Sequence, residues 1–184
     1  TIPKLNIKHN ISDDLMVYGT YSEGFRPSGV NRLRPTDPAP KTYDADYLES
    51  LELGFKSTLG DGKVVMNGAI YSMDWKDYQT TTYDLSLVAV AFVDNVGNAE
   101  VTGVELNILY AINDTTSLTY YYNGVDSTLS EDYFQNGVLY ATSGNRLSYM
   151  PENSAYVSLD KDYTLMGNSA SVSYTHLTLP TSHN

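Results

Sequence analysis

The residues best suited to binding chemistry are three arginines, Arg26, Arg32 and Arg34, which lie close together in a segment that contains several prolines. A guanidinium binds a carboxylate through two parallel hydrogen bonds, so this group predicts a site for an anionic ligand. Pairing within the chain and contact with lipopolysaccharide are the alternatives. Pairing is favoured, above all for Arg26. The carboxylates that allow it belong to Glu23, Asp37 and Asp44.

The other chemistry-bearing residues form no catalytic or metal-binding set. His9 has no second histidine and no carboxylate at metal-ligand spacing, so we expect a structural role for it. His176 and His183 belong to a terminal segment treated below. Without a positioned base a hydrolase is disfavoured, and the absence of cysteine excludes disulfides and thiolate metal sites. We therefore expect no enzyme, no cofactor and no bound metal.

Composition narrows the class of partner. Acidic residues outnumber basic ones, 22 to 11, and the net charge of −11 argues against nucleic acid, because binding to phosphates calls for a basic face. No apolar run approaches the length of a membrane helix. The 17 tyrosines suit a surface that is half apolar and half wet, such as the aromatic girdle of a membrane barrel. A tyrosine-rich soluble β-protein is the alternative.

The elements that must position these residues are strands. Val104, Leu106 and Ile108 alternate with Glu105 and Asn107, and the same period of two recurs along the chain. This alternation predicts an all-β protein in which Leu106 faces an apolar surrounding and Glu105 an aqueous interior. We expect about eight strands, over 2–11, 15–26, 46–59, 63–80, 99–112, 117–127, 146–160 and from 163 onward.

The connections between these strands alternate between short and long. Short turns lie near Asp13, Asp61, Asp114 and Lys161, and long polar connections cover about 27–46, 77–98 and 124–153. Short turns on one side and long loops on the other are typical of an antiparallel transmembrane β-barrel, with the turns in the periplasm and the loops outside. The expected outer positions, one in each long connection, are Arg32, Tyr83 and Glu131.

Four motifs carry a family resemblance. Tyr-Ser-Glu-Gly-Phe-Arg-Pro at 21–27 resembles a strand-end motif of TonB-dependent receptor barrels, and so does Asn-x-Gly followed by Gly-x-Glu over 95–105. Leu-Glu-Leu-Gly-Phe-Lys-Ser at 51–57 and Gly-Asn-Arg-Leu at 144–147, with Pro151 soon after, are the other two. The resemblance covers 1–170 in the family's order. The motif residues to which it gives structural roles are Gly24, Phe25, Arg26, Pro27, Asn95, Gly97, Gly103 and Glu105.

The resemblance implies part of a 22-stranded barrel of the bacterial outer membrane, plugged by another domain. It implies active uptake of a scarce nutrient, most often a ferric siderophore, with the TonB complex, membrane lipid and a small-molecule or metal-chelate substrate as partners. The plug and the segment that contacts TonB are not in this sequence. Glu105 either contacts the plug or is a solvated inner charge. A complete eight-stranded barrel with a structural or adhesion role, and a soluble β-sandwich, stay open as alternatives.

The C-terminal segment has a different explanation. The ten residues from Val172 to Thr181 look like the translation of a transposase sequencing adaptor. We therefore expect a barrel fragment over 1–170 and a non-native tail over 171–184, which includes His176 and His183. The alternative is an ordinary final strand over about 169–179.

Overall fold

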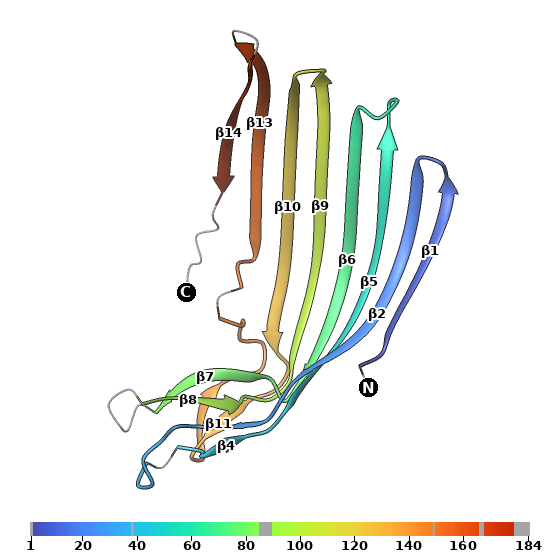
Figure 1. The fold of residues 1–184 in the computed structure, drawn as a ribbon. Helices are drawn as coiled ribbons and strands as arrows, with labels where there is room; N and C mark the ends of the chain where they lie inside the picture. Colours follow the sequence, from blue (N-terminus) through green and yellow to red (C-terminus); the bar gives the residue numbers. More distant parts are fainter. Residues whose placement is uncertain (1, 38, 85–89, 149, 166–167, 179–184) are drawn as a thin grey trace.

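The computed structural model describes residues 2–37, 39–84, 90–148, 150–165 and 168–178. Eight long strands form one antiparallel sheet in the order β1-β2-β5-β6-β9-β10-β13-β14, so each strand pairs with its neighbours in the chain (Figure 1). Their bounds are β1 (Lys4–Ser12), β2 (Leu15–Arg26), β5 (Asp46–Leu59), β6 (Val64–Lys76), β9 (Ala99–Asn113), β10 (Thr116–Leu129), β13 (Asn153–Leu165) and β14 (Asn168–Thr178). The predicted all-β fold is confirmed.

The sheet is open. Strands β1 and β14 are its two edges and do not pair with each other. The pairing that would close an eight-stranded barrel is therefore absent from the described residues, as is a second long-stranded sheet of the kind that forms a sandwich. No described helix has the length and apolar character of a membrane span.

Three strand boundaries differ from the sequence prediction. The short turn expected near Lys161 is wrong, because β13 continues through it to Leu165 and β14 begins only at Asn168. The strand expected over 63–80 ends at Lys76, because Asp77 takes a positive φ of 54° and the chain turns there. The strand expected over 146–160 begins only at Asn153. Before it, Arg146 makes a single bridge to Thr128, and Pro151, which has no backbone N–H, cannot donate to a sheet ladder.

The short turns and the long connections lie at opposite ends of the sheet, as expected (Figure 1). At the β5–β6 turn Gly60, Asp61 and Gly62 all have positive φ, of 61°, 54° and 88°. Glycine adopts this conformation without steric cost, and Asp is among the few other residues that tolerate it. The turn at this end is therefore tight and leaves no loop to cover the sheet.

The two faces of the sheet differ in chemistry. Leu53 pairs with Gly19 and Ile70, and Ile70 pairs with Val104, so these residues share one face, here called the apolar face. Lys56, Asn67 and Asn107 pair across the same strands on the other side, the polar face. Leu53 is 52% exposed and Ile70 58% exposed, so nothing in the described chain covers the apolar face.

The long connections form a layer of their own at one end. This loop layer, the described residues within 27–45, 77–98 and 130–152, contains three small hairpins: β3 (Gly29–Val30) with β4 (Thr42–Tyr43), β7 (Gln79–Asp84) with β8 (Val90–Asn95), and β11 (Tyr133–Gln135) with β12 (Val138–Ala141). Its main buried cluster joins loop residues to the polar face. The members of the cluster are Val96, Ala99, Val101, Leu129, Tyr133 and Leu147.

Strand β14 crosses the predicted boundary at residue 170. It pairs with β13 from Asn168 to Thr178. Backbone pairing is open to any extended segment at a sheet edge, so the non-native origin of residues 171–184 stays a prediction.

Candidate functional site

The sequence-predicted Arg26 lies where the sheet meets the loop layer, and it pairs with a residue that the sequence did not single out as a site. Its Nε lies 3.1 Å from Oδ1 and 2.9 Å from Oδ2 of Asp46, and its terminal amine also contacts Oδ2. The same amine donates to the Gln79 carbonyl at 2.7 Å. The guanidinium lies over the Trp75 ring at 4.9 Å. Arg26 therefore joins the ends of β2 and β5 to the first residue of β7.

Asp46 is the centre of this junction. It is only 1% exposed, and its carboxylate also accepts from Trp75 Nε1 at 2.9 Å and from the Gln79 backbone N–H at 3.1 Å. Burial alone raises the pKa of Asp46, but the Arg26 guanidinium and the hydrogen bonds from Gln79 and Trp75 outweigh it and hold the pKa below its ordinary value. The carboxylate therefore stays charged at neutral pH and is fully occupied by the chain itself.

A second junction contains the predicted motif residues Asn95 and Gly97. The Asn95 side chain accepts from the Asp44 N–H at 2.8 Å and donates to the Asp77 carbonyl at 2.7 Å. Gly97 has a φ of 91°, and its carbonyl accepts from the Tyr78 N–H at 2.7 Å. A side chain at position 97 would be strained and would also meet Glu131, so the glycine is required here.

Two further contacts bind the three parts of the loop layer to one another. Tyr133 on β11 donates to Asp94 on β8 at 2.6 Å. Burial, followed by this bond to the Asp94 carboxylate, raises the pKa of Tyr133 well above its ordinary value. The Asn31 side chain donates to the Val93 carbonyl at 2.8 Å and accepts from its N–H at 2.9 Å. The loop layer is therefore a connected platform.

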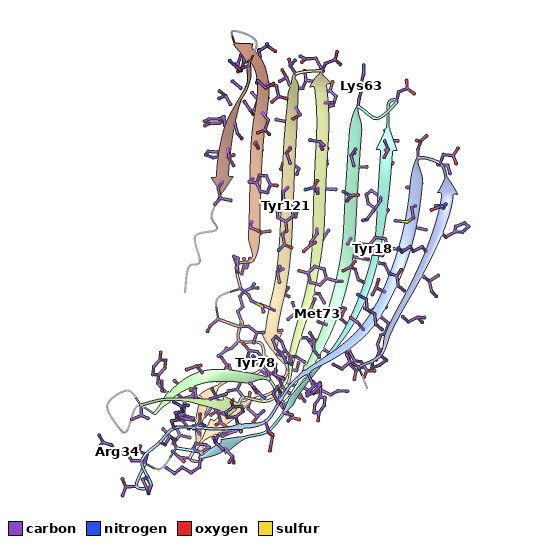
Figure 2. The ribbon with its side chains drawn as sticks, in the orientation of Figure 1. Tyr18, Arg34, Lys63, Met73, Tyr78 and Tyr121 are labelled. Carbon is purple, nitrogen blue, oxygen red and sulfur yellow. The ribbon has the colours of Figure 1, made fainter. Side chains whose placement is uncertain are left out.

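The fold does not place the other two predicted arginines beside Arg26. Arg32 and Arg34 are exposed, and within the described part of the chain neither guanidinium has an ion-pair partner. Figure 2 shows Arg34 at the outer tip of the loop layer, away from the sheet. Asp37 bonds the backbone N–H of Arg34, not its side chain. Ligand binding by Arg26, Arg32 and Arg34 stays a prediction, and only Arg32 and Arg34 have free guanidinium groups for it.

The remaining motif residues have identifiable surroundings. Phe25 stacks on Tyr47 with ring centres 6.3 Å apart, on the apolar face near the loops. The Pro27 carbonyl accepts from the Gln79 side chain at 3.2 Å. Gly103 lies beneath the Tyr71 ring, which occupies the space a Cβ would need, whereas nothing lies within 4 Å of the Cβ position of Gly24.

The polar face carries a band of tyrosines and carboxylates. Glu105 is exposed there, level with Ala69 and Asn123 on the neighbouring strands. Tyr121 and Tyr156 stack at 5.5 Å, and Figure 2 shows Tyr18 and Tyr121 on separate strands of the same sheet. His9 is opposite Val17 on the apolar face. No group of three metal-ligating side chains converges among the described residues.

Sequence reasoning missed Asp46, Trp75 and Gln79 as parts of the junction. Trp75 is the single tryptophan and lies just before the long connection expected over 77–98, which is a usable signal. The buried state of Asp46 had no such signal, because it depends on a loop that returns from more than thirty residues away.

Comparison with known proteins agrees with this geometry. The family model described as "TonB dependent receptor-like, beta-barrel" matches residues 1–180. The chain is 26% identical over 152 residues to the pesticin receptors of Yersinia enterocolitica and Yersinia pestis, and the match covers 83% of this chain. It spans about a fifth of the length of these relatives, 21%.

Solved structures show the same fold. The ferric yersiniabactin uptake receptor FyuA of Yersinia pestis superimposes with a TM-score of 0.68 at 21% identity, over 95% of this chain and 28% of that one. BauA, the ferric preacinetobactin receptor of Acinetobacter baumannii, gives 0.67 at 16% identity, over 97% and 25%. The open sheet with its loop layer is thus part of a larger barrel of the outer membrane, and the chain belongs to the TonB-dependent receptor family.

Proposed function

We propose that the parent protein imports a ferric siderophore across the outer membrane, using energy passed through TonB. The observation that carries the proposal is the loop layer, which is held over the polar face by the Arg26–Asp46 and Asn95 junctions. Binding sites are commonly mounted on loops over a rigid scaffold. The relatives support the substrate class, since FyuA and BauA are described as receptors of ferric chelates.

The chemistry of the loop layer suits such a ligand. Arg32 and Arg34 offer unpaired guanidinium groups for an anionic chelate, and Tyr83 and Phe134 are exposed aromatic surfaces, at 49% and 57%. Arginine binds carboxylates in a two-pronged geometry, and aromatic side chains give contact area at low entropic cost. The ligand would be released unchanged, because no catalytic set of side chains is found in the part of the chain that the structure describes.

The polar face supports the plugged arrangement that the family implies. Glu52 and Glu105 lie on this face among tyrosines. They are suited to contact basic side chains of a plug domain, which would occupy the barrel interior. Transport through a plugged barrel is active, and this is the reason that the proposal includes TonB.

The test is uptake of radiolabelled ferric siderophores by iron-limited cells that carry the complete gene, with and without TonB. We expect uptake of at least one siderophore that depends on TonB. Cells with the double variant Arg32→Gln, Arg34→Gln should take up less of this siderophore when its concentration is limiting. Cells with the control Lys63→Gln, which lies in a turn at the opposite end, should take up as much as the wild type. Equal uptake without TonB, or open-pore conductance of the purified barrel, would refute active import.

A further inference from the structure

Strand β1 presents a regular series of amide and ammonium groups to the polar face. The Asn6 side chain donates to Thr20 on that face at 2.6 Å, and Lys4, Lys8 and Asn10 follow at a spacing of two. Figure 1 shows that β1 runs along one edge of the sheet, from the loop layer to the short-turn end. The series therefore extends over the height of the sheet.

A third lysine continues this series. Lys56 on β5 is opposite Met16, which is opposite Asn10, so these three share a level near the short turns. We call Lys4, Lys8 and Lys56 the lysine series. All three are exposed, and none has an ion-pair partner among the described residues. Strand rise and spacing place each of these cations on the order of 12 to 14 Å from the next.

The carboxylates of the polar face lie mainly on other strands. Beside the buried Asp46 they are Glu52, Glu105, Asp160 and Asp162, on β5, β9 and β13. Glu52 is nearest to the series, four residues from Lys56 on the same strand, and the described side chains form no ion pair between them. The polar face thus has a basic side along β1 and an acidic side that also carries the tyrosines.

The lysine series ends at a hollow near the short turns. This hollow has a volume of about 400 Å³, and most of its lining is polar, including Asn10, Lys56 and Asn67. Among the described residues, the short turns carry one cation, Lys63, and four carboxylates, at Asp13, Asp14, Asp61 and Asp114. Their net negative charge disfavours an anion, so an anion that passes Lys56 is not retained at this end.

We propose that the lysine series guides an anionic ferric chelate along the β1 side of the barrel interior, a role that rests on the proposed function. Lys4 lies next to β2, and the connection that follows β2 carries Arg32 and Arg34. A lysine is a hydrated point charge on a flexible stem, whereas an arginine holds a carboxylate in a fixed two-pronged geometry. Passage needs binding that is favourable enough to enter and weak enough to leave, and spaced lysines meet both conditions.

The acidic side leaves this route open. Glu52 and Glu105 suit basic side chains of a plug, so the plug and the ligand use different parts of the polar face. If the lysines instead bind acidic side chains of the plug, their removal loosens the plug for every solute. The charge of the transported solute therefore separates the two roles.

The test measures TonB-dependent uptake by iron-limited cells that carry the complete gene. The probes are ferric citrate and a ferric tris-catecholate, which are anionic, and a neutral ferric tris-hydroxamate. The triple variant Lys4→Gln, Lys8→Gln, Lys56→Gln should lower the maximal rate for an anionic probe several-fold. Surface binding of that probe in cells without TonB should not change, because the loops bind it first. Lys8→Arg should retain most of the uptake, and Lys161→Gln, on the apolar face, should retain all of it.

The amount of each variant in the outer membrane is measured on an unheated gel, and if the triple variant does not assemble, Lys8→Gln alone decides. Unchanged uptake of the anionic probes would overturn the proposal. So would an equal loss for the neutral probe, or open-pore conductance of the purified variant, since either result assigns the lysines to plug contact. Wild-type uptake of the neutral probe alone would overturn the route but not active import. Absence of TonB-dependent uptake of all three probes would refute the proposed function itself.

Discussion

The sheet and the loop layer of this chain are stabilised by different surroundings. In the sheet, apolar side chains such as Leu53 and Ile70 project outward and stay more than half exposed, at 52% and 58%. In the loop layer, Ala39 and Phe92 are each only 3% exposed, and a charged pair lies at the junction with the sheet. The sheet needs lipid on one face and neighbouring strands at its edges, whereas the loop layer carries its own small core.

The sheet and the loop layer therefore place different requirements on the amino-acid sequence. A strand in a barrel wall needs only alternation, because lipid and water supply the two environments. A loop layer needs particular partners, because a buried carboxylate is tolerated only with hydrogen bonds and an opposite charge. In the sheet, the effect of a substitution on stability should therefore depend on the face that the residue occupies, which we call the facial rule. In the loop layer and at its junction with the sheet, it should depend on the particular contact that is lost, which we call the contact rule.

The largest expected effect comes from a substitution that violates the facial rule. Leu106→Arg places a charge on the apolar face and should lower the free energy of unfolding of the complete receptor by about 2 to 4 kcal/mol if it lies near mid-depth. Asn107→Arg, one residue further along β9, points to the polar face and should cost far less. Urea titration in lipid vesicles measures both. Equal costs would show that the two faces are wrongly assigned.

The next largest effect comes from a substitution that removes a contact at the junction of the sheet and the loop layer. Asp46→Asn removes the charge that pairs with Arg26. It also replaces a carboxylate oxygen with an amide NH2, which cannot accept the hydrogen bonds that Trp75 and Gln79 donate. The Arg26 side chain is 47% exposed, so water replaces part of the lost ion pair, and we expect the free energy of unfolding to fall by about 2 kcal/mol. Hydrogen exchange should accelerate over 79–95 but not in β9. Asp44→Asn, whose backbone and not side chain is bonded, is the matched control. Unchanged exchange over 79–95 would contradict the anchoring role.

The same junction predicts a response to acid. The folded pKa of Asp46 lies below the unfolded value, so the carboxylate stabilises the loop layer above the unfolded pKa, and this stabilisation is lost as the pH falls through the folded pKa. Exchange over 79–95 should rise below about pH 4 in the wild type, since that is where an ordinary Asp titrates. The Asp46→Asn protein should show little of this rise. A similar rise in both would assign the acid response to another group.

The period of two allowed prediction of most of the sheet, because alternation alone fixes which residues share a face. Leu106 and Glu105 lie on opposite faces as expected, and the eight strands are present. The junctions could not be predicted in the same way. Gln79 reaches Asp46 only because Asp77 turns the chain back over the polar face, and no local pattern records where a loop returns.

The arginines show the same limit. Their closeness in sequence suggested one group, but Arg26 ends a strand while Arg34 lies at a loop tip, so the fold separates them. The pairing expected for Arg26 with nearby carboxylates involves Asp46, twenty residues along the chain, and none of the three carboxylates considered from sequence. Cross-strand register brings these two together, and register follows from the whole hairpin.

The smallest expected effect sharpens the comparison at the border of the two regions. Asp74 on β6 lies directly opposite Glu49 on β5 and Glu100 on β9, beyond the apolar part of the face. Like charges opposite one another in a sheet are destabilising. Lys76 relieves only one of them, through its contact with Glu49 at 2.6 Å. Asp74→Asn should therefore stabilise the complete receptor by about 0.5 kcal/mol.

This gain should shrink at high salt, where exposed charges are screened, so the urea titration is repeated in 0.1 and about 1 M sodium chloride, for which the Debye length falls from about 10 to about 3 Å. Asp114→Asn, in a short turn with no carboxylate paired opposite it, should have no effect in either buffer. A loss of stability on Asp74→Asn, or a gain that salt does not reduce, would mean that the carboxylate makes a favourable contact at the membrane border. In that case the border would follow the contact rule of the loop layer and not the facial rule of the sheet.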